Sequence, residues 1–139
     1  MAKYIIDDPV VTIDGDDFSD TFSSVTIEAE FERVSVTAFG ADFNEYLSGL
    51  GEATITIEAF QDHASNELDQ NMWPLFINKT PVTVTVKPTS AAVSATNPKY
   101  SMTGVLTTYS PIAGAKGEAS TTTLTFNNAS QTGITRAFT

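Results

Sequence analysis

The chain has 139 residues, a formal net charge of −10 and 41% hydrophobic residues, which is enough apolar side chain for one packed domain over residues 1–139. It contains no cysteine and a single histidine, His63, which excludes a disulfide framework, thiolate metal centres, cysteine nucleophiles and multi-histidine cages. The acidic balance disfavours a protein that grips nucleic acid phosphates. The sequence shows no membrane-spanning run and no apolar secretory signal, so we expect synthesis in the cytosol.

Composition favours strands, and charge divides the chain in two. Threonine, valine and isoleucine number 21, 10 and 9, and these β-branched residues prefer a pleated surface. Residues 1–69 carry a net charge of −14, whereas residues 70–139 carry +4. One domain built from both halves is expected to have an acidic side and a mildly basic side, which can meet a copy of itself head to tail. The alternative is an acidic surface that only keeps the protein soluble.

The first half begins with two short apolar runs, 3–6 and 10–13, followed by a turn at 14–17 and two alternating segments. Residues 25–31 alternate apolar and polar side chains, which is typical of a half-buried strand, and residues 33–39 alternate again. Three acidic side chains, Glu28, Glu30 and Glu32, share one face of the first segment. That stripe is either an exposed sheet face or, in a ring of subunits, the wall of a pore.

Residues 39–52 interrupt the alternation with Gly40, Gly49 and Gly51. We interpret them as a long inter-strand loop, a kind of segment that is uncommon unless it has a function. Its aromatic side chains indicate a docking element. The alternative is a loop that folds back over its own core.

The next elements are a strand at 53–60 and a helix at 64–76. Ser65 is the expected N-cap, and Pro74 is expected to end or kink the helix. Trp73 is expected to anchor this helix on the sheet.

Further strands are predicted at 81–88, at 99–110 with a bulge at Gly104, and at 118–126. Residues 134–139 are a last short strand or an arm. The fold class is therefore mainly β: a β-sandwich or barrel of about seven strands with one flanking α-helix and a long inter-strand loop.

The sequence offers little catalytic chemistry. His63 stands beside Asp62 but has no placed nucleophile, so the two do not make a dyad. The acidic run 14–20 fails the spacing of a calcium loop, because Ser19 and Val25 occupy the positions that need glycine and glutamate. A solvated turn or a subunit contact is the preferred interpretation, with a non-standard oxygen site left open. We therefore expect no enzyme activity, no catalytic residues, no cofactor and no metal.

The order and spacing of these segments resemble a phage major tail tube protein of the long, non-contractile kind. The resemblance is carried by DGDDFSD (14–20), by the strand–loop–strand unit at 34–62, by ASNELDQNMWPLF (64–76), by PVTVTVKP (81–88) and by residues 95–126, which open on Asn-Pro-Lys-Tyr. It covers residues 10–136, nearly the whole chain. No single motif in it is diagnostic.

The resemblance implies a structural virion protein that forms hexameric rings stacked into a tail tube, assembled in the host cytoplasm and open to genomic DNA, which passes without specific binding. It implies a tape measure protein, a tail tip and a tail terminator as partners, and no membrane. The loop 39–52 would then join ring to ring through an apolar set, Phe39, Phe43, Tyr46, Leu47 and Leu50. An N-terminal arm, 1–24, and a C-terminal arm, 134–139, would add contacts, and Glu28, Glu30 and Glu32 would be lumen candidates.

Two other classes remain open at this point. A monomeric β-sandwich binding module would use the long loop as a binding site. A tube protein of a contractile or type VI-like injection system would share the tube fold. Its sequence is hard to distinguish from that of a non-contractile tail tube protein.

Overall fold

Hydrophobic alternation every second residue produces a curved antiparallel sheet. The computed structural model describes residues 3, 5–6 and 8–138. Within them, eight strands follow the order β2-β1-β5-β6-β7-β4-β3, with β8 pairing on β6. The strands are β1 Val10–Ile13, β2 Asp16–Asp17, β3 Phe22–Ser35, β4 Tyr46–Phe60, β5 Val82–Lys87, β6 Lys99–Thr108, β7 Thr121–Asn128 and β8 Ile134–Ala137, and a 3-10 turn spans Ser19–Thr21. The mainly β prediction is confirmed.

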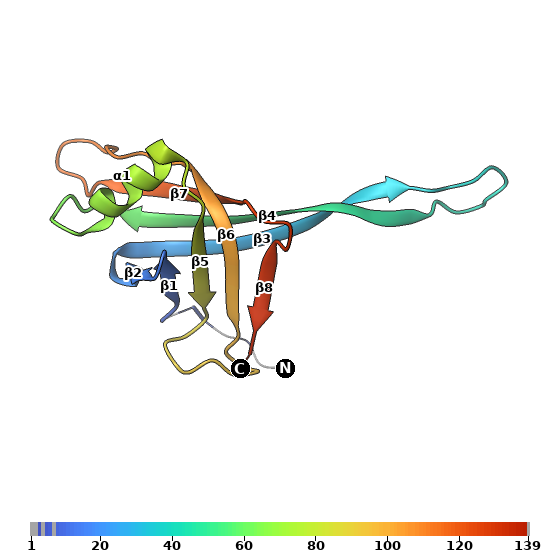
Figure 1. Cartoon of the computed structure of the whole chain (residues 1–139), viewed down its shortest axis with the longest axis horizontal. Coiled ribbons are helices and arrows are strands. Elements are labelled where there is room, and N and C mark those ends of the chain that lie inside the picture. Colours follow the sequence, from blue (N-terminus) through green and yellow to red (C-terminus); the bar gives the residue numbers. More distant parts are fainter. Residues whose placement is uncertain (1–2, 4, 7, 139) are drawn as a thin grey trace.

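The sheet curls so that its two halves share one core. Figure 1 shows β5, β6 and β8 crossing the long β3 and β4 steeply. The buried side chains come from alternate positions of five strands, among them Ile55, Ile57, Val84 and Phe126. Each such side chain stabilises the fold by about 1.5–3 kcal/mol through the apolar area that it removes from water.

The helix α1, Leu68–Asn78, covers one side of this core with Leu68 and Met72. It begins later than predicted, because Asn66 takes a left-handed conformation and no side chain caps the first turn. The amide of Asp69 instead donates to the carbonyl of Asp62 at 3.0 Å. The helix also continues through Pro74 for one further turn, to a left-handed C-cap at Lys79.

Several other sequence predictions need correction. The segments 25–31 and 33–39 are not two strands, because β3 runs unbroken to Ser35. The region called an N-terminal arm, 1–24, contains β1, which pairs with β5 inside the sheet. Of the two alternatives for residues 134–139, the short strand is confirmed for 134–137, which form β8. Gly104 is paired without a bulge; it is glycine because a Cβ there would lie 3.0 Å from the carbonyl oxygen of Asn127.

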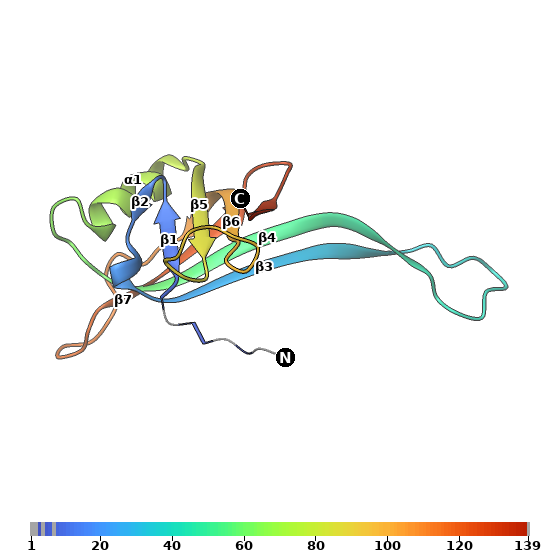
Figure 2. The ribbon, with the colours of Figure 1, turned by 90° about the horizontal axis from the view of Figure 1, so that it is seen from below.

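The hairpin of β3 and β4 reaches far beyond the rest of the molecule (Figures 1 and 2). β4 pairs with β7 only from Thr54 onward, so its first residues pair with β3 alone. We call residues 28–53 the arm. Its outer part is a two-stranded ribbon with an unpaired edge on each side, a form that is marginally stable without a partner.

Candidate assembly interface

Much of the segment predicted as a loop, 39–52, is strand. β4 begins at Tyr46, so the connection between the strands is only 36–45. The loop prediction was wrong for residues 46–52 because Gly49 and Gly51 are typical turn residues. In the structure they allow close cross-strand packing: a Cβ on Gly51 would lie 2.9 Å from the Phe31 ring, and one on Gly49 would lie 3.0 Å from Val34.

A β-bulge separates the inner and outer parts of the arm. Phe31 pairs with Gly51, but Arg33 pairs with Ser48, so β4 carries one extra residue between these pairs. The bulge holds Leu50, which is 84% exposed. Bulges of this kind strengthen the local twist and redirect side chains, and Figure 2 shows β3 and β4 crossing in the outer part of the arm.

The predicted apolar docking set lies along this arm and is exposed. Phe39 and Phe43 stand in the connecting loop, and Tyr46, Leu47 and Leu50 lie on β4. The loop's base is fixed, because the amide of Val36 donates to the carbonyl of Glu45 and the amide of Glu45 donates to Oγ1 of Thr37 at 2.8 Å. The alternative in which this segment folds back on its own core is therefore wrong.

Two residues that the sequence did not single out add to the exposed aromatic side chains of the arm, on the face opposite to the three glutamates. Phe31 is 67% exposed on β3. The guanidinium of Arg33 lies 4.2 Å from the centre of the Tyr46 ring, a cation–π contact that holds the ring in place. Alternation through residues 25–31 would place Phe31 on the side of the core, but at this point of the arm the sheet has no second layer to cover the ring.

The three predicted acidic residues share one face of β3, opposite to the core. Register places Glu28 across from Thr54 and Glu30 across from Glu52, and directly paired residues point to the same side. Glu30, Glu32, Leu50 and Glu52 line a shallow hollow there. Glu58 lies farther along β4 on this side, across from Thr123 of β7. Alternation through 54–58 would have identified Glu52 and Glu58 as members of the acidic face.

Neutral polar side chains continue the acidic face over the neighbouring strands. Oγ1 of Thr54 donates to Asn127 at 3.2 Å, and the Asn127 amide donates to Oγ1 of Thr107 at 2.6 Å. Thr56 and Thr125 are paired on the same side. The resulting surface spans β3, β4, β7 and the end of β6, and combines hydroxyl and amide groups with negative charge.

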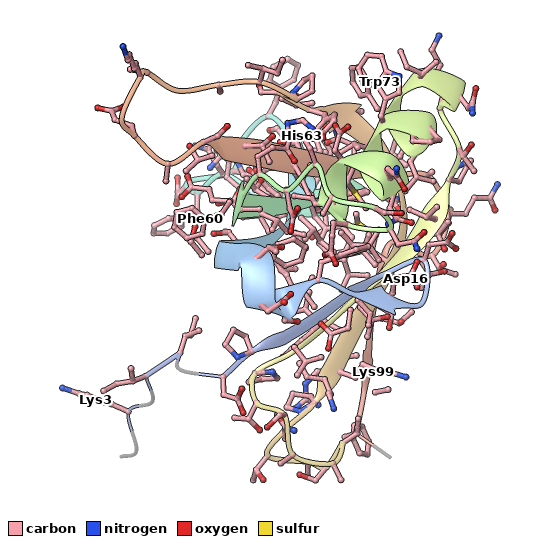
Figure 3. The ribbon with its side chains drawn as sticks, turned by 90° about the vertical axis from the view of Figure 1, so that its left-hand side faces the viewer. Lys3, Asp16, Phe60, His63, Trp73 and Lys99 are labelled. Atoms are coloured by element: carbon pink, nitrogen blue, oxygen red, sulfur yellow. The ribbon has the colours of Figure 1, made fainter. Side chains whose placement is uncertain are left out.

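His63 belongs to a separate cluster at the end of the body away from the arm (Figure 3). Its Nδ1 lies 3.4 Å from Asp69. The hydroxyl of Tyr109 donates to the same carboxylate at 2.5 Å and accepts from Gln61 at 2.9 Å. Burial, together with this hydrogen bond to Asp69, raises the pKa of Tyr109, so the hydroxyl stays protonated and fastens α1 to the sheet. The neighbouring Asp62 does not contribute to this contact; its carboxylate accepts from the Ala64 amide.

The acidic run 14–20 comprises a tight turn, β2 and the start of the 3-10 turn, and hydrogen bonds between its own residues hold it together. Oδ1 of Asp17 accepts from the amide of Ser19 at 2.9 Å and from its hydroxyl at 2.5 Å. Among the described residues, no three acidic or histidine side chains come together in a way that could hold a metal ion. In the same part of the chain, no helix has the length and apolar character that a membrane crossing requires.

No protein-family profile and no curated protein matches the sequence. Among solved structures, a chain from the virion of a native gene transfer agent particle superposes with a TM-score of 0.73 at 17% identity, covering 95% of both chains. The chain has a tail-tube-like fold.

Two further structures share this tail-tube-like fold. A chain from the tail of an empty gene transfer agent particle, with C6 symmetry, gives a TM-score of 0.66 at 17% identity over 86% of this chain and 82% of the other. A chain from the baseplate of the anti-feeding prophage, six-fold symmetrised, gives 0.63 at 9% identity over 98% and 97%. These likenesses confirm the fold that the sequence resemblance predicted.

Proposed function

We propose that this protein is a structural virion protein that polymerises as stacked, six-membered rings into a tail tube through which genomic DNA is delivered. One observation carries the proposal: a folded arm that projects from the body, pairs only with itself and exposes Phe39, Phe43 and Leu50. An isolated domain gains nothing from such an arm, whereas a repeating assembly can bury it. The six-fold symmetry of the assemblies that hold similar folds supports the ring.

In this proposal the apolar and the acidic side chains of the arm have different roles. The apolar set on the connecting loop and β4 makes the contact between rings, where aromatic side chains supply most of the binding energy. The acidic face, with Glu28, Glu30, Glu32, Glu52 and Glu58, lines the lumen. The open edge of β3 pairs with a neighbour in the ring, which removes an edge that would otherwise aggregate.

A negative, hydroxyl-rich wall suits a channel for DNA. Carboxylates repel phosphates, so the duplex gains no counterion-release energy from contact with the wall and moves without binding. We further propose that the tube forms in the host cytoplasm and meets a tape measure protein, a tail tip and a tail terminator, and that its role is structural rather than enzymatic.

Electron microscopy and light scattering of the purified protein test this function directly. We expect hollow tubes or rings of uniform width. Tyr46→Ala and Leu50→Ala are expected to leave the fold intact and prevent polymerisation, while Val93→Ala, a half-buried control in the loop between β5 and β6, is expected to polymerise normally. Normal tubes from both arm variants would contradict the role of the arm, and monomers that also fail to add to purified tail tips would overturn the tube proposal.

A further inference from the structure

The helix α1 leaves an apolar surface uncovered on its outer side. Trp73 is 44% exposed and Ile77 is 52% exposed, although the sequence predicted that Trp73 would anchor the helix. Phe76 takes that place: it packs against the core, and its ring lies 6.0 Å from that of Trp73. Pro74 and the C-cap residue Lys79 are exposed as well. We call Trp73, Pro74, Ile77 and Lys79 the helix ridge.

The helix ridge carries one positive charge, Lys79, and the far end of the arm is acidic. Lys79 stands at the C-cap of α1, and its ammonium has no ion-pair partner within the described residues. Residues 36–45, the tip of the arm, carry Asp42 and Glu45 and no lysine or arginine. Both surfaces therefore combine exposed aromatic rings with unpaired charge, and their charges have opposite sign.

The two surfaces also lie at opposite ends of the molecule. In Figure 1 the arm projects to the right while α1 lies on the left of the body. Figure 3, which faces that left-hand end, shows Trp73 at its upper edge. A copy shifted along the long axis therefore brings its α1 alongside the arm of the preceding copy. Such a head-to-tail contact does not close on itself and can repeat without limit.

We propose that the tip of the arm, with Phe39 and Phe43, docks on the helix ridge of a second copy of this chain. This inference rests on the proposed tube function and adds the surface that receives the arm. Trp73 supplies the aromatic anchor at the centre of the contact. Lys79 faces Asp42 and Glu45, which favours this register over others.

A second basic and apolar region is a weaker receiver. Arg136 and Phe138 lie together near the C-terminus, with the guanidinium 5.7 Å from the ring centre. However, Arg136 already donates to the hydroxyl of Tyr100 and to the carbonyl of Ala95. This region belongs to the lower side of the body near the chain ends, and not to the end opposite the arm (Figure 1).

Disulfide crosslinking tests the contact, because the chain has no cysteine of its own. In the double variant Phe43→Cys, Ile77→Cys, each copy presents one thiol on the arm and one on the helix ridge. Mild oxidation is expected to give a ladder of linked chains on a non-reducing gel. Each single variant can give at most dimers. The matched control is Phe43→Cys, Thr132→Cys, whose second thiol lies on the turn between β7 and β8, and it is expected to give no ladder.

Microscopy of the unmodified protein under the same conditions separates this inference from the tube function. Tubes together with a ladder from the double variant Phe43→Cys, Ile77→Cys support both proposals. Tubes without that ladder, or with an equal ladder from the Thr132→Cys control, overturn the docking site and leave the tube proposal intact. A ladder without tubes supports the docking contact and overturns the tube. Neither tubes nor a ladder overturns both.

Discussion

Tyr109 connects three elements of the body with one hydroxyl group. It lies just after β6, donates to Asp69 in the first turn of α1 and accepts from Gln61 at the end of β4. Its ring also packs edge-on against Phe76 at 6.3 Å. The helix has no N-terminal side-chain cap, so the hydrogen bond from Tyr109 to Asp69 fixes the position of its first turn.

Tyr109→Phe is expected to lower the free energy of unfolding by about 1–2 kcal/mol, because a hydrogen bond to a charged group is lost while the ring remains. Urea unfolding followed by circular dichroism measures the change. The control is Tyr100→Phe, since the Tyr100 hydroxyl only accepts a 3.4 Å contact from Arg136 and its loss should stay within about 0.5 kcal/mol. Equal losses in both variants would contradict the role given to Tyr109.

Alkaline pH is expected to weaken the fold through the same residue. The pKa of Tyr109 is raised in the folded state, mainly by burial, so the folded state holds this proton more tightly than the unfolded chain does. The stabilisation is complete below about pH 10, the ordinary tyrosine pKa, and declines above it by up to about 1.4 kcal/mol per pH unit. Urea titrations at pH 8 to 11 should show a shallower decline in Tyr109→Phe than in the unmodified protein. Parallel declines would rule out this linkage.

At the scale of elements, the arm and the body are expected to be energetically separate. The side chains of residues 28–52 are exposed or only half-buried, and none of them belongs to the core. The arm therefore contributes little to the folding free energy of a single copy. Its stability in an assembly must come from neighbouring copies.

Replacing residues 34–47 with Asn-Gly tests this separation. Arg33 and Ser48 are directly paired, so a two-residue type I′ turn can join them. We expect the free energy of unfolding to change by less than about 1 kcal/mol while polymerisation is lost, measured by urea unfolding and by sedimentation. A large loss of stability would show that the arm supports the body. Normal tubes would show that the arm is not an assembly element.

The elements that the sequence predicted well are those with a simple repeat. Alternation through 53–60 and 81–88 gave β4 and β5 because one face of each is buried in a shared core. The strand at residues 46–52 was missed because Gly49 and Gly51 resemble turn residues, and their role depends on Phe31 and Val34 in the opposite strand. No local pattern contains that pairing.

The residues of the candidate interface were also predicted only in part. The glutamates of β3 were placed on one face because strand geometry alone decides it, and the apolar set of residues 39–50 is exposed as predicted, while its docking role stays a prediction. The exposure of Trp73 was not predicted, because it depends on Phe76 filling the space between α1 and the sheet. Which of two neighbouring aromatic residues on a helix points inward is decided by tertiary packing.

At the scale of the whole molecule, the proposed lumen face predicts how assembled tubes treat DNA. Tubes carrying Glu30→Lys, Glu32→Lys and Glu52→Lys are expected to bind short labelled duplexes, to lose them steeply with added salt, and to protect them from nuclease. Tubes with the same positions changed to glutamine are the control, since they lose the repulsion without gaining attraction. Binding without nuclease protection would place the acidic face on the outside of the tube.

The separation of the arm from α1 along the long axis also gives any stack of copies a direction. One end of such a filament displays a row of unoccupied arms, and the other displays a row of unoccupied helices. The two ends therefore differ in shape, hydrophobicity and sign of charge. In the proposed tube, a capping factor that recognises one end would not recognise the other, and we expect subunits to add to the two ends at different rates. In the proposed tube, the direction of growth therefore follows from the structure of a single copy.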